Sequence, residues 1–218
     1  MADFIQIFVE GDGDVKFISD YISHIIPNVS VDIKKKKVAN ISIDGITKIR
    51  IQGLEGWSDI QNVKPDIKRN EENGGVNLII FDADTIHNEG GFDKRKQEIH
   101  DKISGTTCEI FLFPNNQDDG ALEDLFENII NTKNAPIFDC WNKFETCLQD
   151  SASPKVGRDL TIPAKKSKIY VYLEALLGKS KEQKKKIKDP FRNFDDTDHW
   201  DLDTDYLNPL KDFITKHL

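Results

Sequence analysis

The stretch VNLIIFDADT, residues 76–85, joins a strand-length apolar run to acidic residues at its carboxyl end. Two other stretches share this design and are rich in Ile, Val and Phe: FIQIFVEG (residues 4–11) and CEIFLFPNN (residues 108–116). TKIRIQGLEG (residues 47–56) is a weaker fourth example, and Asp44-Gly45 just before it is typical of a hairpin turn. Runs of this length and composition predict β-strands.

Segments with helical periodicity separate the predicted strands. Residues 15–26 place apolar side chains on one face and end before Pro27, whereas residues 57–70 and 92–103 predict more polar helices. Strands that alternate with helices predict an α/β fold with a mostly parallel sheet flanked by helices. In such sheets, ligands bind outside the carboxyl ends of the strands. The acidic residues of this chain lie at those ends.

The sequence from residue 121 onward has a mainly helical pattern, in segments 121–130, 136–150, 165–178 and 207–218. The last segment is amphipathic, with Leu210, Phe213 and Ile214 expected to point inward. Residues 151–164 contain Ser, Pro and Gly and predict a loop. We therefore expect an α/β core over residues 1–150 and a helical C-terminal extension over residues 151–218.

The composition favours a cytoplasmic protein. No apolar segment of the 218 residues approaches the roughly 20 residues needed to span a bilayer, and the N-terminus lacks the pattern of a signal peptide. Cys108, Cys140 and Cys147 form no CxxC pair and no even-numbered framework, so we expect reduced thiols.

The formal net charge of −8 argues against a protein that holds nucleic acid through its overall field. Local basic runs remain candidates for phosphate contacts, although a solvated turn or helix face is the more common role of any single run. They are Lys34 to Lys37, Lys165 with Lys166 and Lys168, and Lys184 to Lys186.

Three carboxylates at predicted strand ends point to a metal site. Asp82 and Asp84 alternate around Ala83, so an extended backbone would direct both carboxylates the same way. Like charges so close repel unless a cation neutralises them, and hard oxygen ligands suit Mg²⁺ or Mn²⁺. Glu10 follows the first predicted strand. The alternative is that these groups cap helices, a role for which Asp12 and Asp14 are better placed than Glu10.

The ordered pair of motifs, V-E-G at residues 9–11 and D-x-D at residues 82–84, resembles the Toprim domain of topoisomerases, primases and OLD-family nucleases. FLFPNNQDDGALEDLFENII (residues 111–130) is similar to the region after the fourth strand in small bacterial Toprim-like proteins related to the OLD nucleases. The resemblance covers residues 4–130 and implies a Toprim-like, Rossmann-like sheet.

The resemblance also implies roles for individual residues. Glu10 takes the place of the family's glutamate, an acid/base or metal-associated group, and Asp82 and Asp84 take the places of its Mg²⁺-binding pair. Glu123 could complete the catalytic site and Asp124 could bind a metal, or both could compensate a helix dipole. Lys165, Lys166 and Lys168 would neutralise phosphate from the extension.

These roles predict phosphoryl chemistry that depends on Mg²⁺ or Mn²⁺ and acts on DNA, RNA or a nucleotide. Phosphodiester cleavage by a nuclease is the leading hypothesis. The acidic balance favours a different class, a non-catalytic module that binds nucleic acid or a partner protein.

A third hypothesis uses the same motif. LIIFDADT (residues 78–85) resembles the first motif of haloacid-dehalogenase-type phosphatases, with Asp82 as nucleophile and Asp84 as acid/base. Asp195 and Asp196 would then form a late metal pair. The strand and helix that precede the motif in this chain count against this assignment.

Overall fold

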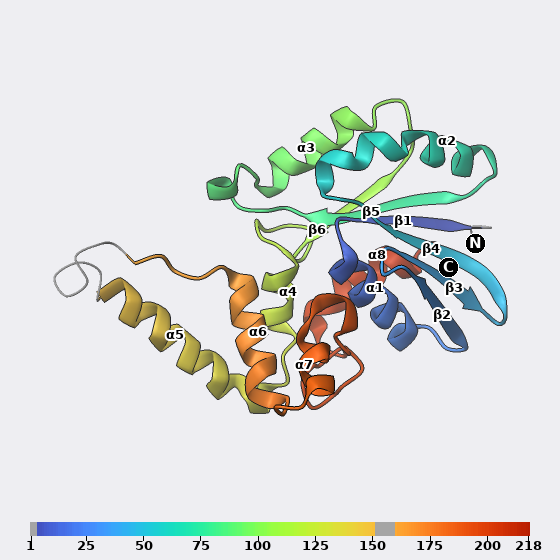
Figure 1. The fold of residues 1–218 in the computed structure, drawn as a ribbon. Helices are drawn as coiled ribbons and strands as arrows, with labels where there is room; N and C mark the ends of the chain where they lie inside the picture. The colour runs from blue at the N-terminus through green and yellow to red at the C-terminus, as the bar shows by residue number, and fades with distance from the viewer. Residues whose placement is uncertain (1–3, 151–159) are drawn as a thin grey trace.

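A computed structural model describes residues 4–150 and 160–218 (Figure 1). It contains one six-stranded sheet with the strand order β2-β3-β4-β1-β5-β6. The strands are β1 (Ile5–Val9), β2 (Val29–Lys34), β3 (Val38–Ile43), β4 (Ile46–Gly53), β5 (Val76–Asp82) and β6 (Glu109–Phe113). The four strands β4, β1, β5 and β6 pair in parallel, whereas β2 and β3 form an antiparallel edge. The predicted α/β class with a mostly parallel sheet is confirmed.

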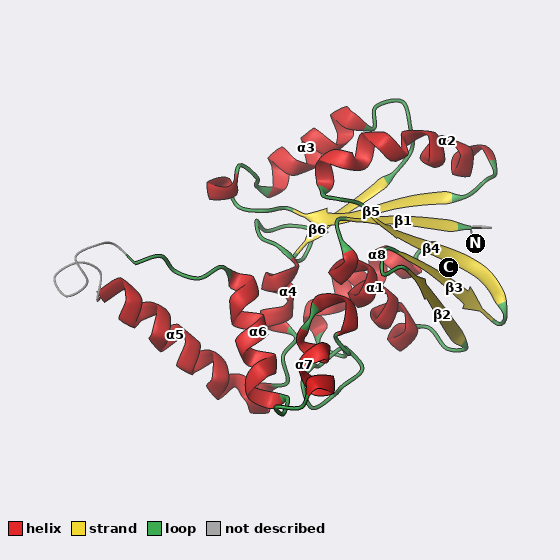
Figure 2. Ribbon diagram, viewed as in Figure 1, coloured by secondary structure: helices red, strands yellow, loops and turns green. Residues whose placement is uncertain are grey.

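Helices cover both faces of the sheet (Figure 1). One face carries α2 (Lys64–Glu72) and α3 (Phe92–Lys102), and the other carries α1 (Asp12–Ile25), α4 (Leu122–Asn128) and α8 (Asn208–Thr215). The remaining helices are α5 (Ala135–Asp150), α6 (Lys165–Leu176) and α7 (Lys181–Ile187). Short 3₁₀ turns connect them, among them η1 (Trp57–Val63) and η4 (Asp189–Phe191). Figure 2 shows α5 extending away from the sheet.

Alternation along the central strands supplies a core to each face. Ile7 and Val9 of β1 belong to the core under α1, whereas Phe8 between them belongs to the core under α2 and α3. All three side chains are fully buried. Because the sheet is covered on both sides, its strands read as continuous apolar runs in the sequence.

The C-terminal extension shares the core of the sheet. An aromatic cluster joins Phe17 of α1, Phe126 of α4, Phe194 and Trp200, with ring centroids 5.0–5.6 Å apart between neighbours. The predicted inward residues of the last helix, Leu210, Phe213 and Ile214, are all buried. The predicted domain boundary and most of the predicted loop at 151–164 fall on residues 151–159, which lie outside the described residues.

One predicted helix is divided in the structure, and two predicted turns are present. The predicted helix at 57–70 is divided into η1 and α2, because Pro65 stands in the first turn of α2, a position that starts a helix. The lysine run at 34–37 forms the turn between β2 and β3, with Lys35 and Lys36 at positive φ. The hairpin predicted at Asp44-Gly45 is confirmed, with φ values of 49° and 81°.

No helix within the described ranges is both long and apolar enough to cross a membrane.

Candidate functional site

The carboxyl ends of β1 and β5 bring Glu10 and Asp82 together. The two strands pair in parallel, with Val9 opposite Ile80, so the residues that follow them leave the sheet side by side. Glu10 Oε1 accepts a hydrogen bond from the backbone N–H of Asp82 at 3.0 Å. The approach of these two segments, which the sequence analysis required, is therefore present in the fold.

Asp14 adds a carboxylate that the sequence analysis had assigned only to helix capping. It lies in the first turn of α1, and its Oδ2 accepts a hydrogen bond from the N–H of Gly11 at 3.1 Å, so the capping role is present. Burial, and then the charge of Glu10, raise the pKa of Asp14 to about 7. The side chain is half-buried and also lines a cavity that Asp82 lines. The signal in the sequence was its position four residues after Glu10, on the helix that follows the strand.

Asp82 lies at the centre of the acidic groups. Its Oδ1 accepts a hydrogen bond from the N–H of Leu122 at the start of α4, at 2.8 Å. Burial raises the pKa of Asp82 well above its usual range, and the charges of Asp14, Glu10 and Glu123 raise it further. The four residues Glu10, Asp14, Asp82 and Glu123, here called the acidic cluster, come from three segments: the connection from β1 into α1, the end of β5 and the start of α4.

Glu10 is poised to exchange a proton near neutral pH. Burial raises the pKa of Glu10 to about 7, although the hydrogen bond from Asp82 opposes the shift. The charge of Asp84 acts in the same direction as burial, and Arg95 acts against it. A carboxyl group with a pKa near the working pH is suited to general acid/base chemistry.

Asp84 does not lie on an extended strand with Asp82, so that part of the prediction is wrong. β5 ends at Asp82, and Asp84 has a left-handed backbone with φ 57°. Two backbone hydrogen bonds with Gly120, of 2.7 and 2.8 Å, hold it there. The Asp84 carboxylate instead forms an ion pair with Arg95 at 2.7 Å. The Arg95 side chain is only 3% exposed, so Asp84 has a buried cationic partner that the sequence analysis did not identify.

Two cavities meet at Asp82. The first, of about 370 Å³, is lined by the acidic residues Asp14, Asp82 and Glu123 and also by Lys166, Asp189 and Arg192. The second, of about 480 Å³, is lined by Asp82, Asp84, Glu123, Asp124, Lys165 and Lys166, among others. Asp82, Glu123 and Lys166 line both, whereas Glu10 lines neither and lies behind Asp82.

The three lysines predicted to bind phosphate have separate surroundings. Lys165 pairs with Asp124, and Lys166 pairs with Asp189 at 2.6 Å. Lys168 pairs with Glu127 at 2.7 Å and lies 4.7 Å above the Phe138 ring. Of the three, Lys165 and Lys166 line a cavity that the acidic cluster also lines.

Both carboxylate oxygens of Asp124, which was predicted as a metal ligand, already have partners in the folded chain. Its Oδ2 accepts a hydrogen bond from the N–H of Ala121 at 2.9 Å, and its Oδ1 contacts Lys165. The capping alternative therefore describes its contacts better than ligation does.

The donor set of the acidic cluster nevertheless suits a hard cation. Among the described residues, no group of three or more His, Cys, Asp and Glu side chains stands ready-made as a metal site. Within the same residues, however, Glu123 makes no ion pair or hydrogen bond through its carboxylate, and the second oxygen of Asp82 has no donor. Carboxylate oxygens are the ligands that Mg²⁺ and Mn²⁺ prefer. Side-chain rotation would be needed to bring them onto one ion.

Asp195 and Asp196 do not contribute to this site. Asp195 lines a different cavity, together with His24 and Trp200, and Asp196 forms a pair with His199 at 3.3 Å. The phosphatase hypothesis needs an acidic pair at the Asp82 site. The residues it assigned do not line either cavity there.

Comparison with known proteins yields one finding. A protein-family model described as "Protein of unknown function (DUF3226)" matches residues 5–218. No curated protein and no solved structure gives a significant match. The matched range includes both the acidic cluster and the cationic residues of the extension.

Proposed function

The chain belongs to the family of proteins of unknown function DUF3226, and we propose that it is a nuclease that cleaves phosphodiester bonds with the help of Mg²⁺ or Mn²⁺. One observation carries the proposal: four carboxylates from three chain segments gather at the carboxyl edge of a parallel sheet. Three of them have raised pKa values. Such a gathering is unfavourable by itself and becomes favourable when a divalent cation neutralises it.

The arrangement also supports the proposed kinship with Toprim-like proteins. The glutamate motif and the D-x-D motif end β1 and β5, which are adjacent strands of the sheet. The resemblance requires this adjacency. The position of Asp84 next to Arg95 departs from the expected metal-binding pair.

Each residue of the proposed site has a separate role in the reaction. Asp82 and Glu123, with Asp14 beside them, would hold the cation, which neutralises phosphodiester charge and polarises the phosphorus–oxygen bonds. Glu10, with a pKa of about 7, would hold or release the proton of the attacking or leaving oxygen. Lys166, which lines both cavities, would contact the substrate backbone outside the reacting phosphate, from the side of the extension. Asp84 and Arg95 would fix the loop behind Asp82.

Cleavage of labelled single- and double-stranded DNA and RNA tests the proposal. We expect wild-type protein to cleave at least one substrate with Mn²⁺ or Mg²⁺ and to stop when EDTA is added. Asp82→Asn should reduce the rate by about 10²–10³-fold, the usual cost of removing one transition-state stabilising group. Asp212→Asn removes one exposed carboxylate on α8 and serves as the matched control. Equal rates for wild type and Asp82→Asn would refute the enzymatic assignment.

A second candidate function, a non-catalytic module that binds nucleic acid or a partner protein, is favoured by a different observation. Asp84, Asp124 and Asp189 each have a cationic partner in the folded chain: Arg95, Lys165 and Lys166 respectively. Carboxylates that are already neutralised inside the chain are less available to a metal ion, which favours a role in binding without catalysis. Titration with Mn²⁺ separates the two candidates, because the module should show no binding that depends on Asp82.

A further inference from the structure

The three lysine runs of the sequence converge on the short turn η4. Lys36, from the first run, lies 4.5 Å above the Phe191 ring, and Lys185, from the third, lies 4.4 Å from the same ring. Lys166, from the second, pairs with Asp189. Residues from three distant parts of the chain therefore place positive charge around one surface turn, at the edge of the first cavity.

Arg192 adds a buried cation to this surface. Its side chain is 4% exposed and lines the first cavity, as do Asp14, Asp82 and Glu123. One nitrogen donates hydrogen bonds to the carbonyl of Ile187 at 3.2 Å and to Asp189 Oδ1 at 2.9 Å. Its Nε has no hydrogen-bond partner among the described residues. A buried guanidinium with an unused donor has unmet capacity to bind an anion.

The carboxylate of Asp189 forms ion pairs with both Lys166 and Arg192. Its two carboxylate oxygens accept from Lys166 at 2.6 Å and from Arg192 at 2.9 Å. It also lies against the first turn of α1, where a Cβ on Gly13 would stand 3.1 Å from the Asp189 Cβ. A lysine, an arginine and a helix N-terminus around one anion are the surroundings in which proteins bind phosphate.

We propose that the first cavity is a phosphate subsite for nucleic acid, in which Lys166 and Arg192 bind a backbone phosphate next to the one that is cleaved. In the free protein, the Asp189 carboxylate occupies the position of that phosphate. Lys36 and Lys185, which lie over the Phe191 ring, would contact the nucleic-acid strand beyond this subsite. This inference rests on the proposed nuclease function, since it names where the substrate backbone lies.

The trio of Lys166, Arg192 and Asp189 carries a local excess of positive charge. Lys166 and Arg192 contribute +2 and Asp189 contributes −1, which leaves +1 for the trio. The same cavity is also lined by Asp12, Asp14, Asp82 and Glu123, so a phosphodiester would bind at the trio while the proposed divalent cation neutralises the acidic cluster. Because Lys166 and Asp82 line both cavities, a strand that crosses from one cavity to the other passes the acidic cluster on its way.

Binding of a fluorescein-labelled single-stranded oligodeoxynucleotide, followed by fluorescence anisotropy in buffer with Ca²⁺, tests the subsite. Lys166→Met, a change at a half-exposed side chain that should not impair folding, is expected to weaken binding about 3–10-fold. Loss of one phosphate contact should also reduce the slope of log K against log salt by about 0.7. Lys36→Met and Lys185→Met should each reduce the slope by a similar or smaller amount.

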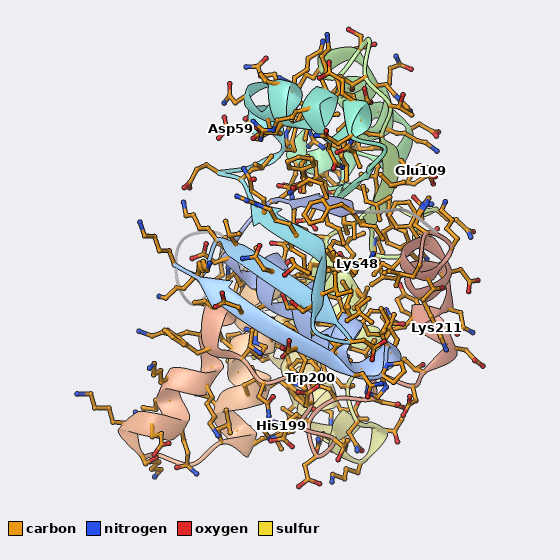
Figure 3. All side chains as sticks on the ribbon, turned by 90° about the vertical axis from the view of Figure 1, so that its right-hand side faces the viewer. Lys48, Asp59, Glu109, His199, Trp200 and Lys211 are labelled. Carbon is orange, nitrogen blue, oxygen red and sulfur yellow. The ribbon has the colours of Figure 1, made fainter. Side chains whose placement is uncertain are left out.

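Asp189→Asn is the decisive variant. We expect it to tighten binding about 3–10-fold, because it frees the two cations, and we expect this gain to shrink when Lys166→Met is also present. Arg192→Lys, which keeps the charge and loses the planar donors, should weaken binding while far-ultraviolet circular dichroism shows the native fold. Lys211→Met and Asp212→Asn provide the same charge changes at neighbouring exposed residues of α8 that do not line the cavity. Figure 3 shows the position of Lys211.

Two results would overturn the subsite. The first is an affinity gain for Asp189→Asn no larger than that for Asp212→Asn, and the second is an effect of Lys166→Met no larger than that of Lys211→Met. Failure of the nuclease proposal has a different signature, since wild type would bind the oligonucleotide through Lys166 and cleave nothing. Cleavage that does not depend on Lys166 would refute the subsite and leave the nuclease intact.

Discussion

At the scale of single residues, the D-x-D motif shows how neighbours decide what a carboxylate does. Asp82 accepts a backbone hydrogen bond and has no cation against it among the described residues, whereas Asp84 is paired with Arg95. Two residues apart in sequence, they differ because the backbone turns left-handed at Asp84. Asp82 is thus the member that could still exchange its protein contacts for a metal ion.

The raised pKa values predict an inverted dependence of stability on pH. Glu10 and Asp14 have pKa values of about 7 in the folded chain, against ordinary values of 4.5 and 3.8. Between these values the unfolded chain ionises while the folded chain keeps its protons, so the free energy of unfolding falls as pH rises from about 4 to about 7. Below this pH range the two groups are protonated in both the folded and the unfolded chain. Above it they are ionised in both, and the free energy of unfolding falls no further.

Thermal unfolding in metal-free buffer measures this effect. We expect the acidic cluster to destabilise the fold, and so to lower Tm, more at pH 8 than at pH 5. In a chain of this size, each kcal/mol lost from the free energy of unfolding lowers Tm by about 2–4 °C. Asp82→Asn should reduce the difference, and Mn²⁺ should raise Tm more at pH 8 than at pH 6. The raised pKa values would be contradicted if the cluster stabilised the fold more at pH 8 than at pH 5 and if Asp82→Asn did not change the pH dependence of Tm.

At the scale of secondary-structure elements, Arg95 ties three of them together. It projects from α3, pairs with Asp84 in the loop after β5 and with Glu98 on its own helix, and lies 4.0 Å over the Trp57 ring of η1. The guanidinium is almost fully buried, so its removal leaves acidic groups without their partner.

Arg95→Met is expected to lower the free energy of unfolding by about 2–3 kcal/mol. Breaking a fully buried ion pair would cost more, but Asp84 keeps some contact with water. The same change should raise the pKa of Glu10 further, since Arg95 opposes that shift. Urea denaturation at constant pH gives the measurement. Arg69→Met removes an exposed pair with Asp66 on α2 and should change stability by less than about 1 kcal/mol. If the two variants were equally mild, the proposed role of Arg95 would be wrong.

The elements themselves were largely predictable from the sequence, and the site was predictable only in part. Apolar runs identify β1, β5 and β6 because strands buried on both faces have no polar alternation. The convergence of Glu10 on Asp82 follows from parallel pairing. The partners Arg95, Asp189 and Arg192 have no local signal, since an exposed and a buried arginine look alike in a sequence. The turn at Asp84 depends on its contact with Gly120, which is distant in the chain.

At the scale of the whole molecule, the extension and the sheet share one hydrophobic core. Phe194 and Trp200 contact Phe126, and α8 covers the sheet, with the ring centroid of Phe213 at 5.4 Å from that of Phe111. Contacts of this kind bury apolar area on both partners, so we expect the two parts to unfold together.

A variant that retains only Trp200, made by Trp57→Phe and Trp141→Phe, tests this cooperativity. We expect its tryptophan fluorescence and its far-ultraviolet circular dichroism to change at the same urea concentration, as in a two-state transition. A fluorescence change that clearly precedes the loss of sheet and helix signal would indicate an extension that folds separately. The parent chain serves as the control for stability lost through the two substitutions.

The division of the cavity between early and late parts of the chain has a consequence for biosynthesis. A ribosome completes the acidic wall when it has translated Glu123, and it adds Lys166, Asp189 and Arg192 only later. The proposed phosphate subsite can therefore form only after Arg192 has been translated, and a chain that stops before this residue would have the carboxylates of the cavity without the complete pair of cations that face a substrate backbone.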